Sequence, residues 1–158
     1  MFKKINWRYT FISAATAALL FSICAYIFIH LADYTASWIL YVGSLLFLFT
    51  MAIATVKESK PKGGDDSTGA HVFAALVTTF TGVILSVFIC FILLLIMDSG
   101  FIMPGPATKV LEHAPPTTLH SKTAGLAVEL FSAATLLCLF GGGIVSVALP
   151  FYVKSTQI

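Results

Sequence analysis

The stretch from His71 to Met97 reads HVFAALVTTFTGVILSVFICFILLLIM and contains no aspartate, glutamate, lysine or arginine. A helix needs about 20 consecutive apolar residues to cross the hydrocarbon core of a bilayer, and this stretch exceeds that length. Backbone N–H and C=O groups find no water in hydrocarbon, so a spanning segment pairs them internally as a helix. The stretch therefore predicts a transmembrane helix.

Three further apolar runs of similar character flank it, at Tyr9–Leu31, Trp38–Val56 and Ala124–Val153. Residues of the set AVILMFWYC make up 58% of the 158 residues, charged residues make up 10%, and mean hydropathy is +0.96. Charged residues are about a quarter of an ordinary soluble domain. The sequence therefore predicts a single all-α domain over residues 1–158. We expect a polytopic membrane protein with a four-transmembrane-helix bundle. Its helices are predicted at about 9–31, 38–56, 71–97 and 124–153, and its outer loop at 98–123.

Basic residues are distributed unevenly among the segments that join these runs. Two of the nine, Lys109 and Lys122, fall in the outer loop. Cytoplasmic segments carry an excess of lysine and arginine, so both termini and the segment after the second run are expected in the cytoplasm. The seven basic residues on that side are Lys3, Lys4, Arg8, Lys57, Lys60, Lys62 and Lys154.

These features predict a multi-pass protein of a bacterial inner membrane or a plasma membrane. The first run is longer than the apolar part of a usual signal peptide, so it is expected to be retained as a helix. No basic block is long enough to indicate nucleic-acid binding. The partners expected from composition alone are the lipid bilayer and other membrane proteins.

Small residues recur where helices are expected to touch. Such residues let helix backbones approach closely in a membrane, where the hydrophobic drive between helices is weak. One alternative is tight packing within this chain, and the other is docking of a different subunit or of a second copy. Because glycine also lowers helix propensity, the glycine triplet can instead mark a flexible point, although close packing is favoured. The candidate positions are Ala74, Thr78, Gly82, Ser86, Cys90, Gly141, Gly142 and Gly143.

Glu129 is the only acidic residue inside an apolar run. Ionisable groups within membranes are costly and often functional. Glu129 follows Ala124 by five residues, or about 7–8 Å along a helix, which places it near the outer headgroups. It is thus an interfacial acid, a subunit contact, or a carboxylate that carries ions or protons.

Possible metal ligands gather on the expected outer side, where carboxylates and imidazoles can together bind a divalent ion. Their spacing matches no close-ligand motif, so they are weak candidates. The three cysteines all lie inside apolar runs without CxxC spacing, and no cofactor is identified. The weak candidates are His30, Asp98, His113 and His120.

The leading functional prediction is a non-catalytic subunit or scaffold of a membrane complex, binding other membrane protein subunits or itself. The principal alternative is a transporter or channel component that uses Glu129. A weaker alternative is a membrane enzyme or redox subunit that uses the outer-face histidines. No GxSxG, HExxH or P-loop signature occurs, so the sequence favours a protein that is not an enzyme.

Overall fold

The computed structural model describes residues 6–59, 68–98, 111–113 and 125–155. These residues are helical apart from short turns and one isolated bridge between Asp33 and Glu112. The segment Leu126–Ser155 is one continuous helix of 30 residues, which is divided below into three elements because its middle part is a π-helix. The elements are α1 (Trp7–Leu31), the 3-10 helix η1 (Tyr34–Ala36), α2 (Trp38–Ser59), α3 (Thr68–Met97), α4 (Leu126–Ser132), the π-helix η3 (Ala133–Leu137) and α5 (Cys138–Ser155).

Four helices in the described part of the chain are long and apolar enough to cross a membrane. This confirms the prediction of an all-α chain with four such runs. The observed helices extend a few residues beyond the apolar runs at several ends. Helical hydrogen bonding continues through polar residues such as Glu58, whereas the prediction stopped at the last apolar residue.

Local capping explains where α1 begins and ends. The Asn6 side chain accepts a hydrogen bond of 3.2 Å from the Tyr9 backbone N–H at the first turn. At the other end Ala32 adopts a left-handed conformation with φ of 49°, and its N–H donates to the Phe28 carbonyl. The chain is thereby turned into η1 and then back along α2.

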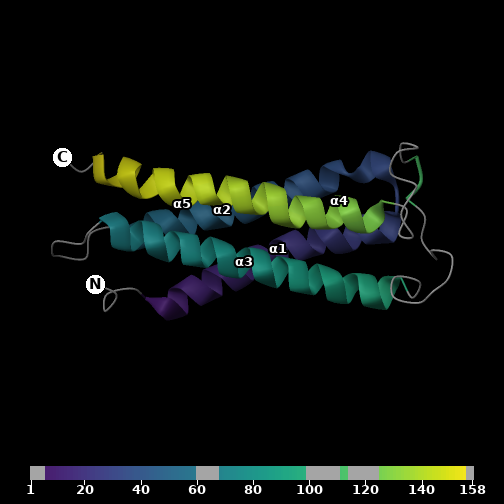
Figure 1. Cartoon of the computed structure of the whole chain (residues 1–158), viewed down its shortest axis with the longest axis horizontal. Coiled ribbons are helices and arrows are strands. Elements are labelled where there is room, and N and C mark those ends of the chain that lie inside the picture. Colours follow the sequence, from purple (N-terminus) through teal and green to yellow (C-terminus); the bar gives the residue numbers. More distant parts are fainter. Residues whose placement is uncertain (1–5, 60–67, 99–110, 114–124, 156–158) are drawn as a thin grey trace.

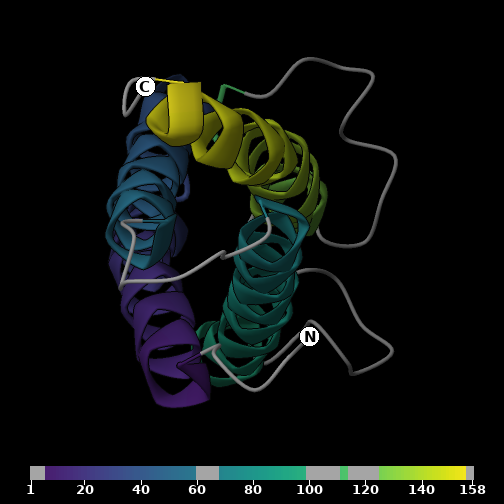
Figure 2. The same cartoon turned by 90° about the vertical axis from the view of Figure 1, so that its left-hand side faces the viewer.

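The long helices lie side by side (Figure 1). Two of them, α1 and α5, contact the same two neighbouring helices. Helix α1 packs against α2 and α3, and α5 packs against the same two helices, so α1 and α5 occupy opposite corners (Figure 2). The start of α1, the end of α2, the start of α3 and the end of α5 all lie at one end of the molecule (Figure 1). This end is called the first end below, and the opposite one the second end.

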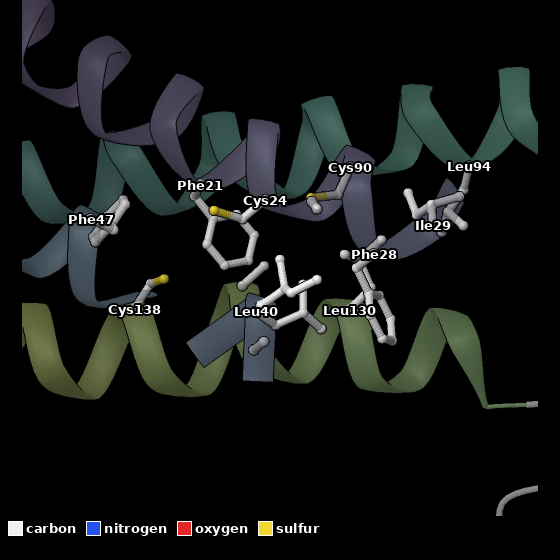
Figure 3. Packing of buried hydrophobic residues seen from close by; sticks show 14 of the residues in the cluster. Phe21, Cys24, Phe28, Ile29, Leu40, Phe47, Cys90, Leu94, Leu130 and Cys138 are labelled. Carbon is white, nitrogen blue, oxygen red and sulfur yellow. The ribbon is translucent and has the colours of Figure 1, made fainter. Parts of the chain in front are cut away.

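The buried core contains large apolar side chains interleaved with small residues. Figure 3 shows Phe21 and Phe28 of α1, Phe47 of α2 and Leu130 of α4 pointing into the space between the helices. The alanines of α1 at positions 14, 17, 18 and 25 are completely buried. Such small side chains let α1 approach its neighbours closely.

The outward surface of the long helices is apolar as well. Phe49, Ile84 and Ile144 are each at least 66% exposed, and each belongs to a different long helix. A soluble protein rarely exposes a continuous apolar surface of this kind. Hydrocarbon is the solvent that accommodates it, in agreement with a membrane protein.

Candidate functional site

The structure places Glu129 in the first turn of α4, where the helix leaves Gly125. The Glu129 backbone N–H donates to the Gly125 carbonyl at 2.9 Å, and Gly125 adopts φ of 84°, a conformation that favours glycine. Leu126 and Leu130 are fully buried, while Val128 is 61% exposed. Glu129 lies between these two faces and is half-buried. It therefore projects along the side of the molecule and not into its core.

Glu129 is one of the residues that line a small pocket of about 180 Å³. We call it the Glu129 pocket. The Ser132 hydroxyl donates to the Glu129 backbone carbonyl at 2.9 Å, so it is already engaged within the helix. The lining is otherwise aliphatic except for the ring and hydroxyl of Tyr41. The residues that line it are Leu40 and Tyr41 of α2 with Glu129, Ser132, Ala133, Leu136 and Leu137.

The chemistry of this pocket suits a cation. A carboxylate supplies negative charge, and the face of an aromatic ring such as that of Tyr41 attracts a positive group. In the described part of the chain, no ion pair or side-chain hydrogen bond engages the Glu129 carboxylate. The pocket thus combines an acid and an aromatic ring at the edge of an apolar surface.

The π-helix η3 begins four residues after Glu129 and supplies Ala133, Leu136 and Leu137 to the lining of the pocket. At its start the Ala133 N–H is shared between the carbonyls of Glu129 and Leu130. The Thr135 hydroxyl donates to the Phe131 carbonyl at 2.6 Å, which further loosens regular helix geometry. π-helical turns often occur at functional sites. Sequence reasoning missed this turn, since closely spaced serine and threonine residues are only a weak signal for it.

The small-residue positions of α3 lie on its buried side. Ala74, Ser86 and Cys90 are completely buried and Thr78 nearly so. A Cβ atom added to Gly82 would lie 2.7 Å from the Met51 Cε atom of α2. These positions therefore face other helices of this chain.

The three consecutive glycines of α5 differ from one another. An added Cβ would lie 2.9 Å from the Leu48 side chain at Gly141, and 2.6 Å from the Thr79 Cγ2 atom at Gly142. At Gly143 it would meet nothing within 4 Å. Gly141 and Gly142 thus permit close contact with α2 and α3 respectively, whereas Gly143 lies on the open surface.

Polar contacts reinforce the same helix pairs. The hydroxyls of Thr79 and Ser146 are 2.8 Å apart and join α3 to α5. The Cys138 thiol donates to the Ser44 hydroxyl over 3.8 Å and joins α5 to α2. Hydrogen bonds between membrane helices contribute on average about 0.6 kcal/mol each, so close packing matters more than these contacts do.

At the second end the connection between α1 and α2 is joined to residues 111–113. The Tyr34 N–H donates to the Glu112 carbonyl at 2.9 Å, and the Glu112 N–H donates to the Ala32 carbonyl at 2.8 Å. The His113 Nδ1 atom lies 3.3 Å from the Asp33 carboxylate. Leu111 is buried beside them. We call this arrangement the outer clasp, after the side on which the sequence predicts it.

Asp33 is held ionised by the outer clasp and by its own turn. The pKa of its carboxyl lies below the ordinary value, first because the Thr35 backbone N–H donates to it and then because the Thr35 hydroxyl does so. The neighbouring His113 ring lowers that pKa further. The carboxylate therefore remains charged over the whole neutral range.

The candidate metal ligands are only partly described. Within residues 6–59, 68–98, 111–113 and 125–155, no three histidine, cysteine, aspartate or glutamate side chains gather as a metal site. His30 is exposed on α1, while Asp98 is buried at the end of α3. His113 meets Asp33, and His120 lies outside the described residues. The metal site stays a prediction.

No protein-family profile, curated protein or solved structure matches this chain. The features that bear on its function are the Glu129 pocket and the packing of the helices.

Proposed function

We propose that this chain is a non-catalytic subunit or scaffold of a membrane complex, with its four long helices crossing the bilayer as a bundle and both termini in the cytoplasm. The observation that carries the proposal is the lateral position of Glu129. A carboxylate at the edge of the hydrocarbon is costly unless another group supplies the opposite charge. Because the Glu129 pocket opens on the side of the molecule, that group is expected to come from a neighbouring molecule.

The interior supports a packing role over a conducting one. The hydroxyls of Ser22, Ser44, Thr78 and Ser86 each donate to a carbonyl four residues earlier in their own helix. Hydroxyls engaged in this way offer little to a hydrated ion or to a polar substrate. The largest cluster of buried side chains is apolar, and the buried hydroxyls of Thr79 and Ser146 are bonded to each other.

The distribution of charge supports the proposed orientation. The described lysines and arginine, Arg8, Lys57 and Lys154, belong to the helix ends that meet at the first end of the molecule. Asp33 and Glu112 lie at the second end, in the outer clasp. An excess of basic residues at one end is typical of the cytoplasmic side.

The experiment that tests the proposal is purification of the chain from its native membrane in a mild detergent, followed by native mass spectrometry. We expect a complex of defined stoichiometry that contains either a second type of chain or a second copy. A chain that is monomeric in several mild detergents and also after cross-linking in intact membranes would contradict the proposal.

A transporter or channel component is the second candidate, because a half-buried carboxylate next to a π-helical turn also suits ion or proton movement. Glu129→Gln keeps the shape of the side chain and removes its titratable charge. In reconstituted vesicles the subunit proposal predicts no flux that depends on Glu129. A proton or ion flux that is abolished in the Glu129→Gln variant, with folding retained, would favour the second candidate.

A further inference from the structure

We infer that the Glu129 pocket receives the lysine or arginine side chain of a transmembrane helix in a partner subunit. This inference deepens the proposed function and rests on it. It names the chemistry of the partner and the depth at which the partner carries its charge.

The depth follows from the two helices that form the pocket. Glu129 lies one turn from Gly125 at the start of α4, and Tyr41 lies about one turn from Trp38 at the start of α2. At 1.5 Å per residue, both side chains are about 4–6 Å inside the second end of their helices. The cation must therefore lie about one turn inside the outer end of the partner helix, where a long basic side chain reaches the pocket easily.

Electrostatics at this end favour a cation supplied from outside the described residues. Its acids are Glu129, Asp33, Asp98 and Glu112, and no lysine or arginine of the described residues lies there. The histidines at this end are His30, which is on α1, and His113, which is engaged with Asp33. Among the described residues at this end, an incoming ammonium or guanidinium group thus meets carboxylates and no lysine or arginine.

The surface next to the pocket favours a helix over a lipid headgroup as the source of that cation. Tyr41 and Leu136 line the pocket, and each is followed one turn further along its helix by another exposed apolar residue. These four residues, which we call the docking strip, are at least 53% exposed. The strip continues one turn inward past the pocket on each helix, so a partner helix can contact both the pocket and the strip, whereas a headgroup would engage the pocket alone. The docking strip comprises Tyr41, Leu45, Leu136 and Phe140.

The test measures association of the full-length chain with model transmembrane peptides by energy transfer in phosphatidylcholine vesicles. One peptide is a leucine-rich helix with a single lysine one turn from its end, and the matched peptide has leucine at that position. We expect the lysine peptide to bind about ten-fold more tightly, as for an interhelical polar contact at the upper end of the usual range. Equal binding of the two peptides would overturn the inference.

Variants of the chain separate the site from general effects of charge. Glu129→Gln is expected to abolish the preference for lysine, while Val128→Gln, on the exposed neighbouring position, should keep it. The double variant Val128→Glu with Glu129→Gln retains the charge but moves it out of the pocket, so it should lose the preference. A lysine preference that persists in Glu129→Gln would refute the assignment.

Two further outcomes point to a different occupant. If the preference appears only in Lys122→Gln, then a lysine of this chain fills the pocket, and the inference is wrong. If vesicles containing phosphatidylethanolamine abolish the preference, and the purified chain retains that lipid only when Glu129 is present, a headgroup fills the pocket instead. A stable native complex without a lysine preference would overturn this inference alone, whereas lysine binding without any native complex would overturn the proposed function.

Discussion

At the scale of single residues, adjacent positions in one helix face different environments. Gly142 has the Thr79 side chain against it, whereas Gly143 faces open space. Because the Thr79 side chain is short and β-branched, it cannot swing aside as a methionine end can. The same triplet therefore contains a position that requires glycine for packing and another that does not.

Gly142→Leu and Gly82→Leu are expected to destabilise the protein, because each added side chain enters a helix contact that is already filled. Overpacking of this kind typically costs about 1–3 kcal/mol. At Gly82 the nearest atom is the end of the flexible Met51 side chain, but the ring of Phe47 also lies 3.0 Å from the added Cβ, so both variants are expected to be clearly destabilised. Thermal unfolding in detergent measures both, and Gly143→Leu is the matched control. A control that is as unstable as Gly142→Leu would show that the loss of stability does not come from the contact with Thr79, because leucine favours a helix more than glycine does.

At the scale of elements, the π-helix η3 keeps one side of a long helix turned inward. Leu130, Ala134, Cys138, Gly142 and Ser146 are spaced four residues apart, and all are buried. In a regular helix each step of four residues drifts about 40° around the axis. The wider π turn offsets part of that drift, because its hydrogen bonds span five residues. It also supplies Ala133, Leu136 and Leu137 to the lining of the Glu129 pocket.

The short 3-10 helix η1 is a second element whose role depends on its surroundings. Asp33 caps it by accepting the Thr35 N–H at 2.9 Å, and the same carboxylate meets His113 from a distant part of the chain. One side chain thus caps the start of η1 and anchors the outer clasp.

The stability that the Asp33 charge contributes through its hydrogen bonds from Thr35 is expected to depend on pH only in acid. Since the folded-state pKa is lowered, the contribution is fully present above the unfolded pKa of about 3.9 and disappears as pH falls through the folded value. Asp33→Asn keeps the capping oxygen and removes the charge. Its melting temperature should fall short of the wild-type value by a constant amount between about pH 5 and pH 6, and the difference should vanish in stronger acid. A difference that grows toward low pH would contradict this.

At the scale of the whole molecule, two ends with different charge are separated by an apolar middle. The described residues place Arg8, Lys57 and Lys154 at helix ends on one side and the outer clasp on the other. Such a molecule has a preferred orientation in a bilayer whose cytoplasmic side favours basic residues.

The orientation is tested by two variants, Thr35→Cys and Ser155→Cys, each of which adds one cysteine at a position that is exposed in the structure. A membrane-impermeant thiol reagent applied to intact cells should label Thr35→Cys at once, and Ser155→Cys only after permeabilisation. The native Cys24, Cys90 and Cys138 are buried, so the wild-type chain serves as the blank. The opposite pattern of labelling would reverse the proposed topology.

The sequence by itself determined the helices and their approximate limits. Hydrocarbon leaves a long apolar segment no other way to pair its backbone groups, so length and composition are sufficient to predict each run. It also singled out Glu129, since a lone acid in an apolar run is conspicuous. The ends were less accurate, because caps such as Asn6 and Gly125 act through local hydrogen bonds and backbone conformation.

Only the tertiary structure decided which side of each helix faces another. The spacing of small residues in α3 does not say that Gly82 meets Met51, nor that Gly142 and Gly143 differ, because those contacts join residues far apart in the chain. Tyr41 and Glu129 likewise come from separate helices, and their meeting in one pocket depends on how α2 and α4 pack. Composition determines that a segment enters a membrane, whereas shape complementarity between helices determines its neighbours.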